Sequence, residues 1–236
     1  TLEGELRWDR PAAATRVGVR LVGLSYANED FAGSASGSYT YTGEGPGVID
    51  LSAQLSRVNA LHLPRYLPLS TIMGDRSRAW LVNAIRSGKS NDARLRLVGD
   101  LRDFPFVDPA KGQFQILAQV REATLDYAAG WPRAEEIDGE LKFERNRMEI
   151  NARRGRILGA NASNVRVSIA QLGNPGAELL IQGDVEGRTA EFLDYIRQSP
   201  VREMIGGFAD GISAQGSGRL RLKLAQGVQG HAHHDQ

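Results

Sequence analysis

Apolar residues recur at every second position over much of this chain, and that period of two limits the fold more than any other feature. Residues 93–102 read ARLRLVGDLR, and residues 216–225 read GSGRLRLKLA. Successive side chains of a β-strand point to opposite faces, so each run predicts a strand with one apolar and one polar face. About a dozen runs of this kind predict a mainly β chain, built on a mostly antiparallel sheet.

Helical spacing interrupts the strands in two places. The first helix is expected to begin near Asp75 and to end near Gly88, and a pair of short helices is expected between residues 189 and 208. Each helix has one apolar stripe, which is typical of a helix that covers a sheet. The residues predicted to form this helical lid are Trp80, Leu81, Ile85, Phe192, Ile196, Val201 and Ile205.

Changes of pattern divide the chain into four segments. Residues 1–60 are a strand-rich N-terminal segment, and residues 61–187 combine the first helix with further strands. Residues 188–225 hold the helical pair and a returning strand, and residues 226–236 form a polar tail predicted to be disordered. All segments except the tail are expected to contribute to one long sheet.

The apolar face of so many strands exceeds what the short helices can cover. It therefore packs on itself, as in a closed barrel or sandwich, or remains an open groove that holds an apolar ligand. Periodicity alone does not separate a dry core from a groove. The candidates for lining a groove are Leu95, Leu97, Phe114, Ile116, Val120, Leu141, Phe143, Ile150, Val167, Ile181, Leu220 and Leu222.

Composition excludes several classes of function. Lys and Arg number 29 and Asp and Glu number 28, so the charge balance gives no case for a nucleic-acid partner. The chain has no cysteine, three of its four histidines lie in the tail, and no nucleophile or metal-binding motif is present. No catalytic residue, metal site or cofactor is predicted. The basic side chains of the two runs quoted above suit a solvated strand face, and attraction of anionic lipid is the alternative.

The segment Trp80–Phe106, WLVNAIRSGKSNDARLRLVGDLRDFPF, resembles the YhdP family of AsmA-like proteins of Gram-negative bacteria. Its features are Trp-Leu, a helix end, and an alternating strand that closes on Gly-x-Leu-x-Asp-Phe-Pro-Phe. Three shorter stretches are similar to the same family: Tyr66–Pro68, Tyr195–Val201 and Gly216–Leu224. The resemblance covers about residues 48–225.

The resemblance implies a long, twisted, mostly antiparallel sheet curved into an open groove, the shape called a β-taco, with a few short helices covering it. It also implies a periplasmic protein that carries phospholipid between the inner and outer membranes, with acyl chains in the groove. The membrane anchor of such a protein is not in this sequence, so we expect a piece of a longer, inner-membrane-anchored chain. The alternative is an envelope assembly scaffold that binds a protein partner at a sheet edge.

Overall fold

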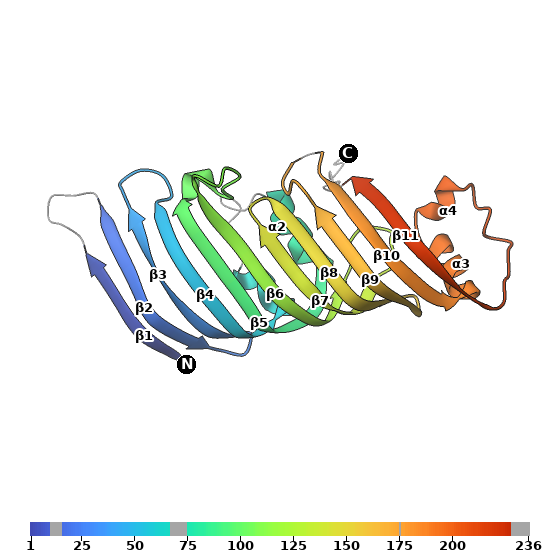
Figure 1. The fold of residues 1–236 in the computed structure, drawn as a ribbon, viewed down its shortest axis with the longest axis horizontal. Coiled ribbons are helices and arrows are strands. Elements are labelled where there is room, and N and C mark those ends of the chain that lie inside the picture. Colours follow the sequence, from blue (N-terminus) through green and yellow to red (C-terminus); the bar gives the residue numbers. More distant parts are fainter. Residues whose placement is uncertain (10–15, 67–74, 175, 228–236) are drawn as a thin grey trace, which may run out of the picture.

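The computed structural model describes residues 1–9, 16–66, 75–174 and 176–227. In these ranges, eleven strands form one antiparallel sheet in which every strand pairs with its neighbours in sequence (Figure 1). The strands are β1 (Leu2–Asp9), β2 (Val17–Ala27), β3 (Phe31–Tyr41), β4 (Val48–Asn59), β5 (Ile85–Asp100), β6 (Gly112–Leu125), β7 (Ala134–Glu144), β8 (Arg147–Ile157), β9 (Ala160–Ile169), β10 (Glu178–Arg188) and β11 (Ser217–Gly227).

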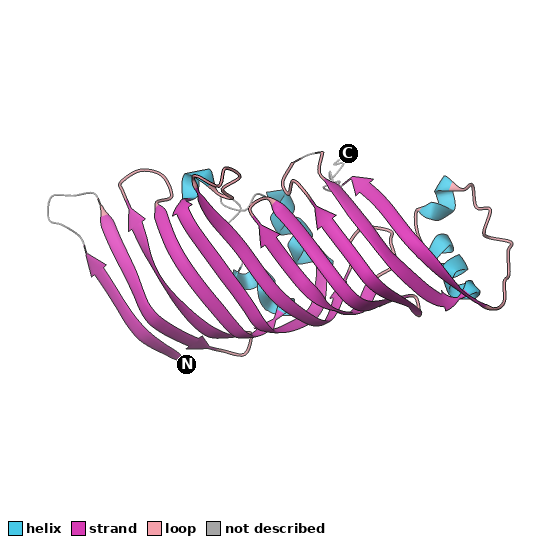
Figure 2. Cartoon of the chain, viewed as in Figure 1, coloured by secondary structure: helices cyan, strands magenta, loops and turns pink. Residues whose placement is uncertain are grey.

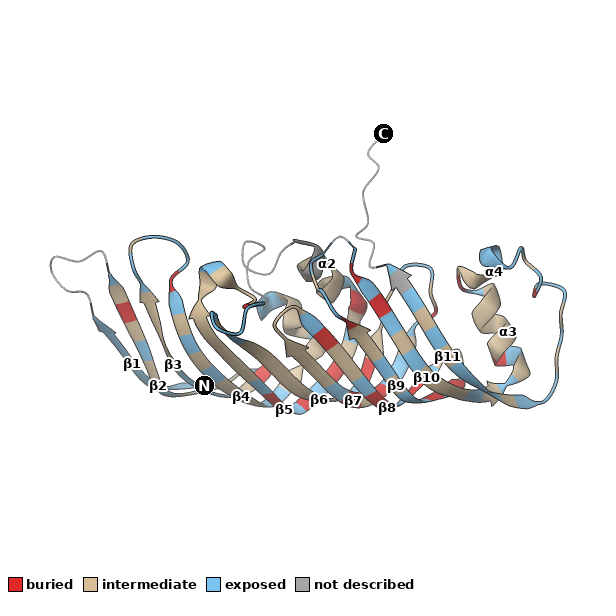
Figure 3. Ribbon diagram, turned by 45° about the horizontal axis from the view of Figure 1, so that its top comes forward, coloured by how far each residue is buried: buried red, intermediate tan, exposed pale blue. Residues whose placement is uncertain are grey.

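The sheet is open, with β1 and β11 as its two edges. The predicted mainly β, antiparallel fold is therefore confirmed. The sheet does not close on itself into a barrel, which was the alternative. The strands curve along their length, so that the sheet is an elongated, bent surface (Figures 1 and 3). The boundaries predicted near residues 60 and 188 fall at strand ends, but β4 pairs with β5 and β10 with β11 across them.

Helices are few and short, and they lie to one side and at one end of the sheet (Figure 2). They are η1 (Ala60–Tyr66), α2 (Asp75–Ala84), η2 (Leu101–Asp103), α3 (Thr189–Arg197) and α4 (Val201–Met204). No helix in the described ranges is long and apolar enough to cross a membrane. One predicted boundary is wrong: Ile85 belongs to β5 rather than to the helix, because it pairs with Leu125 of β6 and so extends the strand past Gly88.

Buried side chains gather in the middle and C-terminal strands (Figure 3). One cluster comprises Met148, Ile169, Ala177 and Leu179, and a second comprises Ala123, Ile137 and Ala152. By contrast, every residue of β1 is exposed. The apolar layer is therefore thick over β6–β10 and thin toward β1.

Phe106 is the most deeply buried large residue of the described chain, with 0% of its surface exposed. Its ring packs on two glycines of neighbouring strands. A Cβ atom on Gly99 would lie 2.7 Å from the ring, and one on Gly112 would lie 2.6 Å from it. Contacts this short leave no room for a side chain at either glycine position. Phe106 therefore packs directly on the backbone of β5 and β6 at these glycines.

Asp30, in the turn between β2 and β3, anchors η1 to the sheet. Its carboxylate is almost fully buried and contacts the ring of His62, while it accepts hydrogen bonds from Tyr66 Oη at 2.9 Å and Arg65 Nη1 at 3.3 Å. The rings of Phe31 and Tyr66 also meet edge to face, 4.4 Å apart. Burial raises the pKa of Asp30, but the hydrogen bonds from Tyr66 and His62 outweigh it, and the net pKa lies below the ordinary 3.8.

Because this pKa is lowered by folding, the Asp30 contacts stabilise the protein fully above the ordinary aspartate pKa of 3.8 and lose their effect as pH falls through the lower value. We therefore expect Asp30→Asn to be less stable than the parent at neutral pH, and the difference to shrink in acid. Urea unfolding at a series of pH values measures this difference. A difference that grew below pH 3.8 would contradict the assignment.

Candidate functional site

The pairing of the strands brings the alternating apolar residues onto one face, because residues directly opposite in an antiparallel pair share a face. We call this surface the apolar face. Three cross-strand rows define it. The first is Leu6–Leu21–Gly37–Leu51–Leu97–Phe114. The second is Ala35–Ala53–Leu95–Ile116–Phe143–Met148–Ile169–Leu179. The third is Gly33–Leu55–Ala93–Ala118–Leu141–Ile150–Val167–Ile181–Leu224.

All twelve residues proposed from the sequence lie on the apolar face. Nine of them belong to the three rows, Val120 continues the same face of β6, and Leu220 and Leu222 precede Leu224 on β11. None is fully buried: eleven are half-buried, and Leu220 is 48% exposed. A closed core would bury them, so their partial exposure shows that this face is not sealed by other parts of the described chain.

The rows change character along the sheet. On β3 they contain Gly33, Ala35 and Gly37, and on β4 Ala53 lies between Leu51 and Leu55, whereas on β7–β10 they contain mainly leucine, isoleucine, valine, phenylalanine and methionine. Small side chains leave more room above the backbone than large ones. The apolar face is therefore deepest near the N-terminal strands and is filled by its own side chains further along.

The opposite face is polar and carries cross-strand ion pairs. Arg154 Nε lies 2.7 Å from Asp138 Oδ2, and Arg219 Nη2 lies 2.8 Å from Glu186 Oε2. Arg96 pairs with Asp50, and Arg221 Nε lies 3.3 Å from Asp184 Oδ1. Arg96, Arg219 and Arg221, three basic residues of the two alternating runs, are thus paired with carboxylates on this face.

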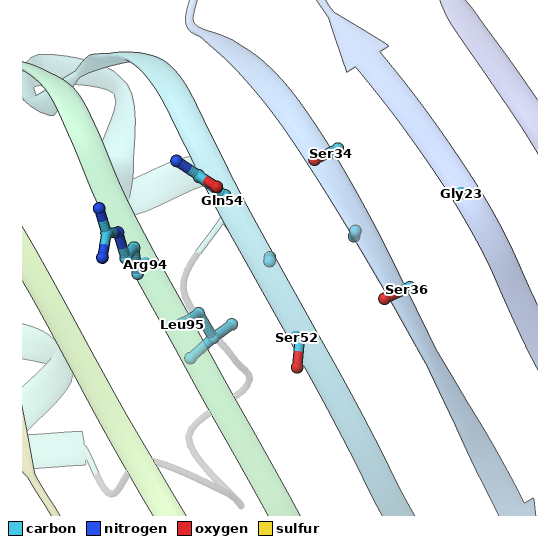
Figure 4. A pocket seen from close by; sticks show the side chains of 9 residues that line it. Gly23, Ser34, Ser36, Ser52, Gln54, Arg94 and Leu95 are labelled. Carbon is cyan, nitrogen blue, oxygen red and sulfur yellow. The ribbon is translucent and has the colours of Figure 1, made fainter.

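A hollow of about 380 Å³ lies over β2–β5, and its lining includes Ala35, Ala53 and Leu95 of the second row (Figure 4). Its polar lining comes from Ser34, Ser36, Ser52, Gln54 and Arg94, and pairing places Ser34, Gln54 and Arg94 in one row on the polar face. A surface of hydroxyl, amide and guanidinium groups does not suit a hydrocarbon chain. The lining thus mixes apolar residues of the second row with these polar groups, and the hollow does not by itself define a lipid site.

Helix α2 lies against the apolar face, behind the middle strands in Figure 1. Its Trp80 packs against the cluster formed by Met148, Ile169 and Leu179, together with the groove candidates Leu141, Phe143, Ile150, Val167 and Ile181. The indole Nε1 also donates a hydrogen bond to the carbonyl oxygen of Tyr127, 3.3 Å away. Trp80 thus covers the buried cluster on this face of the sheet.

The other predicted lid residues are less uniform. Leu81, Phe192, Ile196 and Val201 are half-buried, whereas Ile205 follows the end of α4 and is 41% exposed. α3 is held to the loop after β6 by aromatic contacts: the hydroxyl oxygens of Tyr127 and Tyr195 are 3.4 Å apart, and the Trp131 ring lies 6.0 Å from that of Tyr195. Burial raises the pKa values of both tyrosines, so they stay neutral.

Removal of the Trp80 side chain tests its packing. Because Trp80 is half-buried, Trp80→Ala is expected to lower the free energy of unfolding by about 2 kcal/mol, less than for a fully buried tryptophan. Denaturant unfolding gives the value, and Asn83→Ala, at an exposed position of the same helix, is the control. Equal midpoints for the two variants would mean that Trp80 does not hold α2 on the sheet.

Comparison with known proteins agrees with this geometry. The model of the YhdP protein family matches residues 1–234. The intermembrane phospholipid transporter YhdP of Escherichia coli (strain K12) is 27% identical over 160 residues, which are 68% of this chain and 12% of that protein. The chain thus spans only a small part of that relative's length. No solved structure matches the chain significantly.

Proposed function

Because the chain belongs to the YhdP family, we propose that its apolar face holds the acyl chains of phospholipids and conducts them along the sheet. The observation that supports this most strongly is the continuity of the three apolar rows, which run from strand to strand without a charged residue. Acyl chains need a long apolar surface rather than a specific polar site. The relative from E. coli is itself named an intermembrane phospholipid transporter.

The dimensions of the sheet suit this role. Neighbouring strands lie about 4.8 Å apart, so ten spacings give an apolar face about 48 Å long. The hydrocarbon core of a bilayer is about 30 Å thick, and one acyl chain occupies about half of it. The face therefore has room for several acyl chains lying end to end, which suits conduction better than storage of one ligand.

We place this segment in the periplasm, as part of a longer, inner-membrane-anchored protein. A groove that carries lipid between two membranes has to cross the aqueous space between them, and the polar face of the sheet, with its paired charges, tolerates water on that side. Conduction needs no bond to be made or broken, so we propose a non-enzymatic function.

Helix α2 competes with lipid for part of the same surface. Trp80 rests on side chains of β8–β10 that an acyl chain would also contact. Passage along the full sheet therefore requires either that lipid runs beside α2 or that the helix lifts. In both cases α2 narrows the lipid path along the apolar face. The N-terminal strands remain the most open part of that path.

The proposal is tested by purifying the chain without detergent and extracting its bound lipid. We expect phospholipid to copurify in a reproducible ratio to protein. A preparation that is folded and repeatedly free of phospholipid, and that does not take it up from vesicles, would contradict the proposal.

A second candidate, an assembly scaffold, is favoured by one observation. β1 is an edge strand in which every residue is exposed, and Leu2, Leu6 and Trp8 present apolar side chains there. An unpaired edge can accept a strand from another polypeptide. Capture of one stoichiometric protein partner by lipid-free chain, lost when a proline replaces Glu5 in β1, would favour the scaffold over the conduit.

A further inference from the structure

One basic residue, Arg145, has its backbone at the margin of the apolar face and lacks a close counter-charge. Arg145 occupies the tight turn between β7 and β8, and its N–H donates to the carbonyl oxygen of Phe114, 2.9 Å away. Glu144 pairs with Gln115, so Arg145 stands opposite Phe114. The row that ends at Phe114 is thus followed, one strand further along, by the backbone of Arg145.

The charge of Arg145 is poorly compensated in the described part of the chain. Its Nε is buried and has no hydrogen-bond partner, and its Nη1 lies 3.7 Å from Glu144 Oε1. Glu144 has a closer partner in Lys142, whose Nζ is 2.7 Å from its other carboxylate oxygen. A buried donor without an acceptor is unfavourable, so the site is completed when an acceptor arrives from outside.

Two other cations on this side of the sheet are already paired. Arg102 Nη2 lies 2.6 Å from Asp100, and Lys111 Nζ lies 2.7 Å from Asp103. The turn after β3, residues 42–47, and the described residues of the turn after β9, 170–174 and 176–177, contain no Lys or Arg. Among the described strand ends on this side, Arg147 also has no close ion pair, but it is exposed, whereas Arg145 combines a weak carboxylate contact with a buried Nε.

We propose that Arg145 binds the phosphate of a phospholipid whose acyl chains lie on the apolar face beside Phe114 and Phe143. An amphiphile on this surface has its chains on the rows and its headgroup at their margin, where Arg145 stands. The guanidinium suits a phosphate because its planar donors match two phosphate oxygens, and its side chain is 29% exposed and so within reach. This inference rests on the proposed binding of acyl chains.

The test compares two lipids with identical acyl chains, phosphatidylglycerol and diacylglycerol, which differ in the phosphate. Binding is measured by titration of detergent-free protein, using short-chain forms of both lipids. We expect the parent chain to prefer phosphatidylglycerol, and Arg145→Gln to lose about tenfold in affinity for it while diacylglycerol binding stays unchanged. Arg145→Lys, which keeps the charge but not the planar fork, should retain part of the preference.

Arg147→Gln is the matched control, because Arg147 is exposed, lies two residues from Arg145 and pairs with Glu144 across the hairpin. It should bind both lipids as the parent does, and thermal midpoints establish that every variant is folded. If the parent binds both lipids equally, the Arg145 assignment is wrong while the acyl-chain proposal stands. If it binds neither, the acyl-chain proposal fails. Inorganic phosphate that binds through Arg145 as tightly as the lipid would identify a free-anion site and overturn the headgroup assignment.

Discussion

Replacing Phe106 by alanine is expected to lower the free energy of unfolding by about 4 kcal/mol, the largest loss of stability that we expect from a single substitution in this chain. The ring is 0% exposed and rests on Gly99 and Gly112, which have no side chains to fill the space that alanine would leave. The loop that carries Phe106 would also lose its attachment to β5 and β6. Denaturant unfolding, followed by circular dichroism, measures the effect.

Val107→Ala provides the control for this substitution, since Val107 is the next residue and is 61% exposed. It should change the free energy of unfolding by less than about 0.5 kcal/mol. Two variants with similar stabilities would show that Phe106 is not the anchor of this loop. The same result would remove the structural explanation for the Gly-x-Leu-x-Asp-Phe-Pro-Phe pattern.

Ile116→Asp is expected to abolish most lipid binding while leaving the fold intact. Ile116 lies in the second row between Leu95 and Phe143, so a carboxylate there stands in the path of an acyl chain. Because Ile116 is half-buried on an open face, the new charge can reach water, and we expect a loss of stability of only about 1 kcal/mol. Bound phospholipid and thermal stability should be measured on the same preparation.

Gln115→Asp introduces the same charge on the polar face, beside Arg96, and should leave lipid binding unchanged. Global unfolding of Ile116→Asp would indicate a sealed core, in which a carboxylate cannot be solvated. Unchanged lipid in a stable Ile116→Asp would exclude this strand from the conduit. The comparison therefore separates the role of the apolar face in stability from its role in binding.

Much of the architecture follows from local pattern. The period of two in 93–102 and 216–225 predicted β5 and β11, and polar-face positions of those strands form cross-strand ion pairs at Arg96 and Arg219. The placement of all twelve groove candidates on one face follows from the same alternation, since antiparallel pairing keeps alternate residues on a common face. The helix boundary at Ile85 was misplaced because strand pairing with Leu125 overrides local helical spacing.

Three features depend on contacts between distant segments, and the sequence offers no local signal for them. Phe106 is buried because glycines on two strands leave space for its ring. His62 looks like an isolated histidine among leucines, yet folding brings it to Asp30, 32 residues away. Arg145 reads as an ordinary turn residue until the register places it opposite Phe114. Whether the sheet closes or stays open also depends on its overall curvature, which no strand specifies alone.

The most direct measurement of the central claim is the position of a bound acyl chain. A phospholipid with a photoreactive group at the end of one acyl chain should be loaded into the protein, and the complex should then be irradiated. Mass spectrometry identifies the peptides that are crosslinked to the lipid. We expect crosslinks at apolar-face positions such as Leu95, Ile116 and Ile150, on several strands, because the chains move along the rows. Crosslinks mainly at polar-face positions such as Arg94 and Gln182, or none in a lipid-loaded sample, would contradict a conduit on the apolar face.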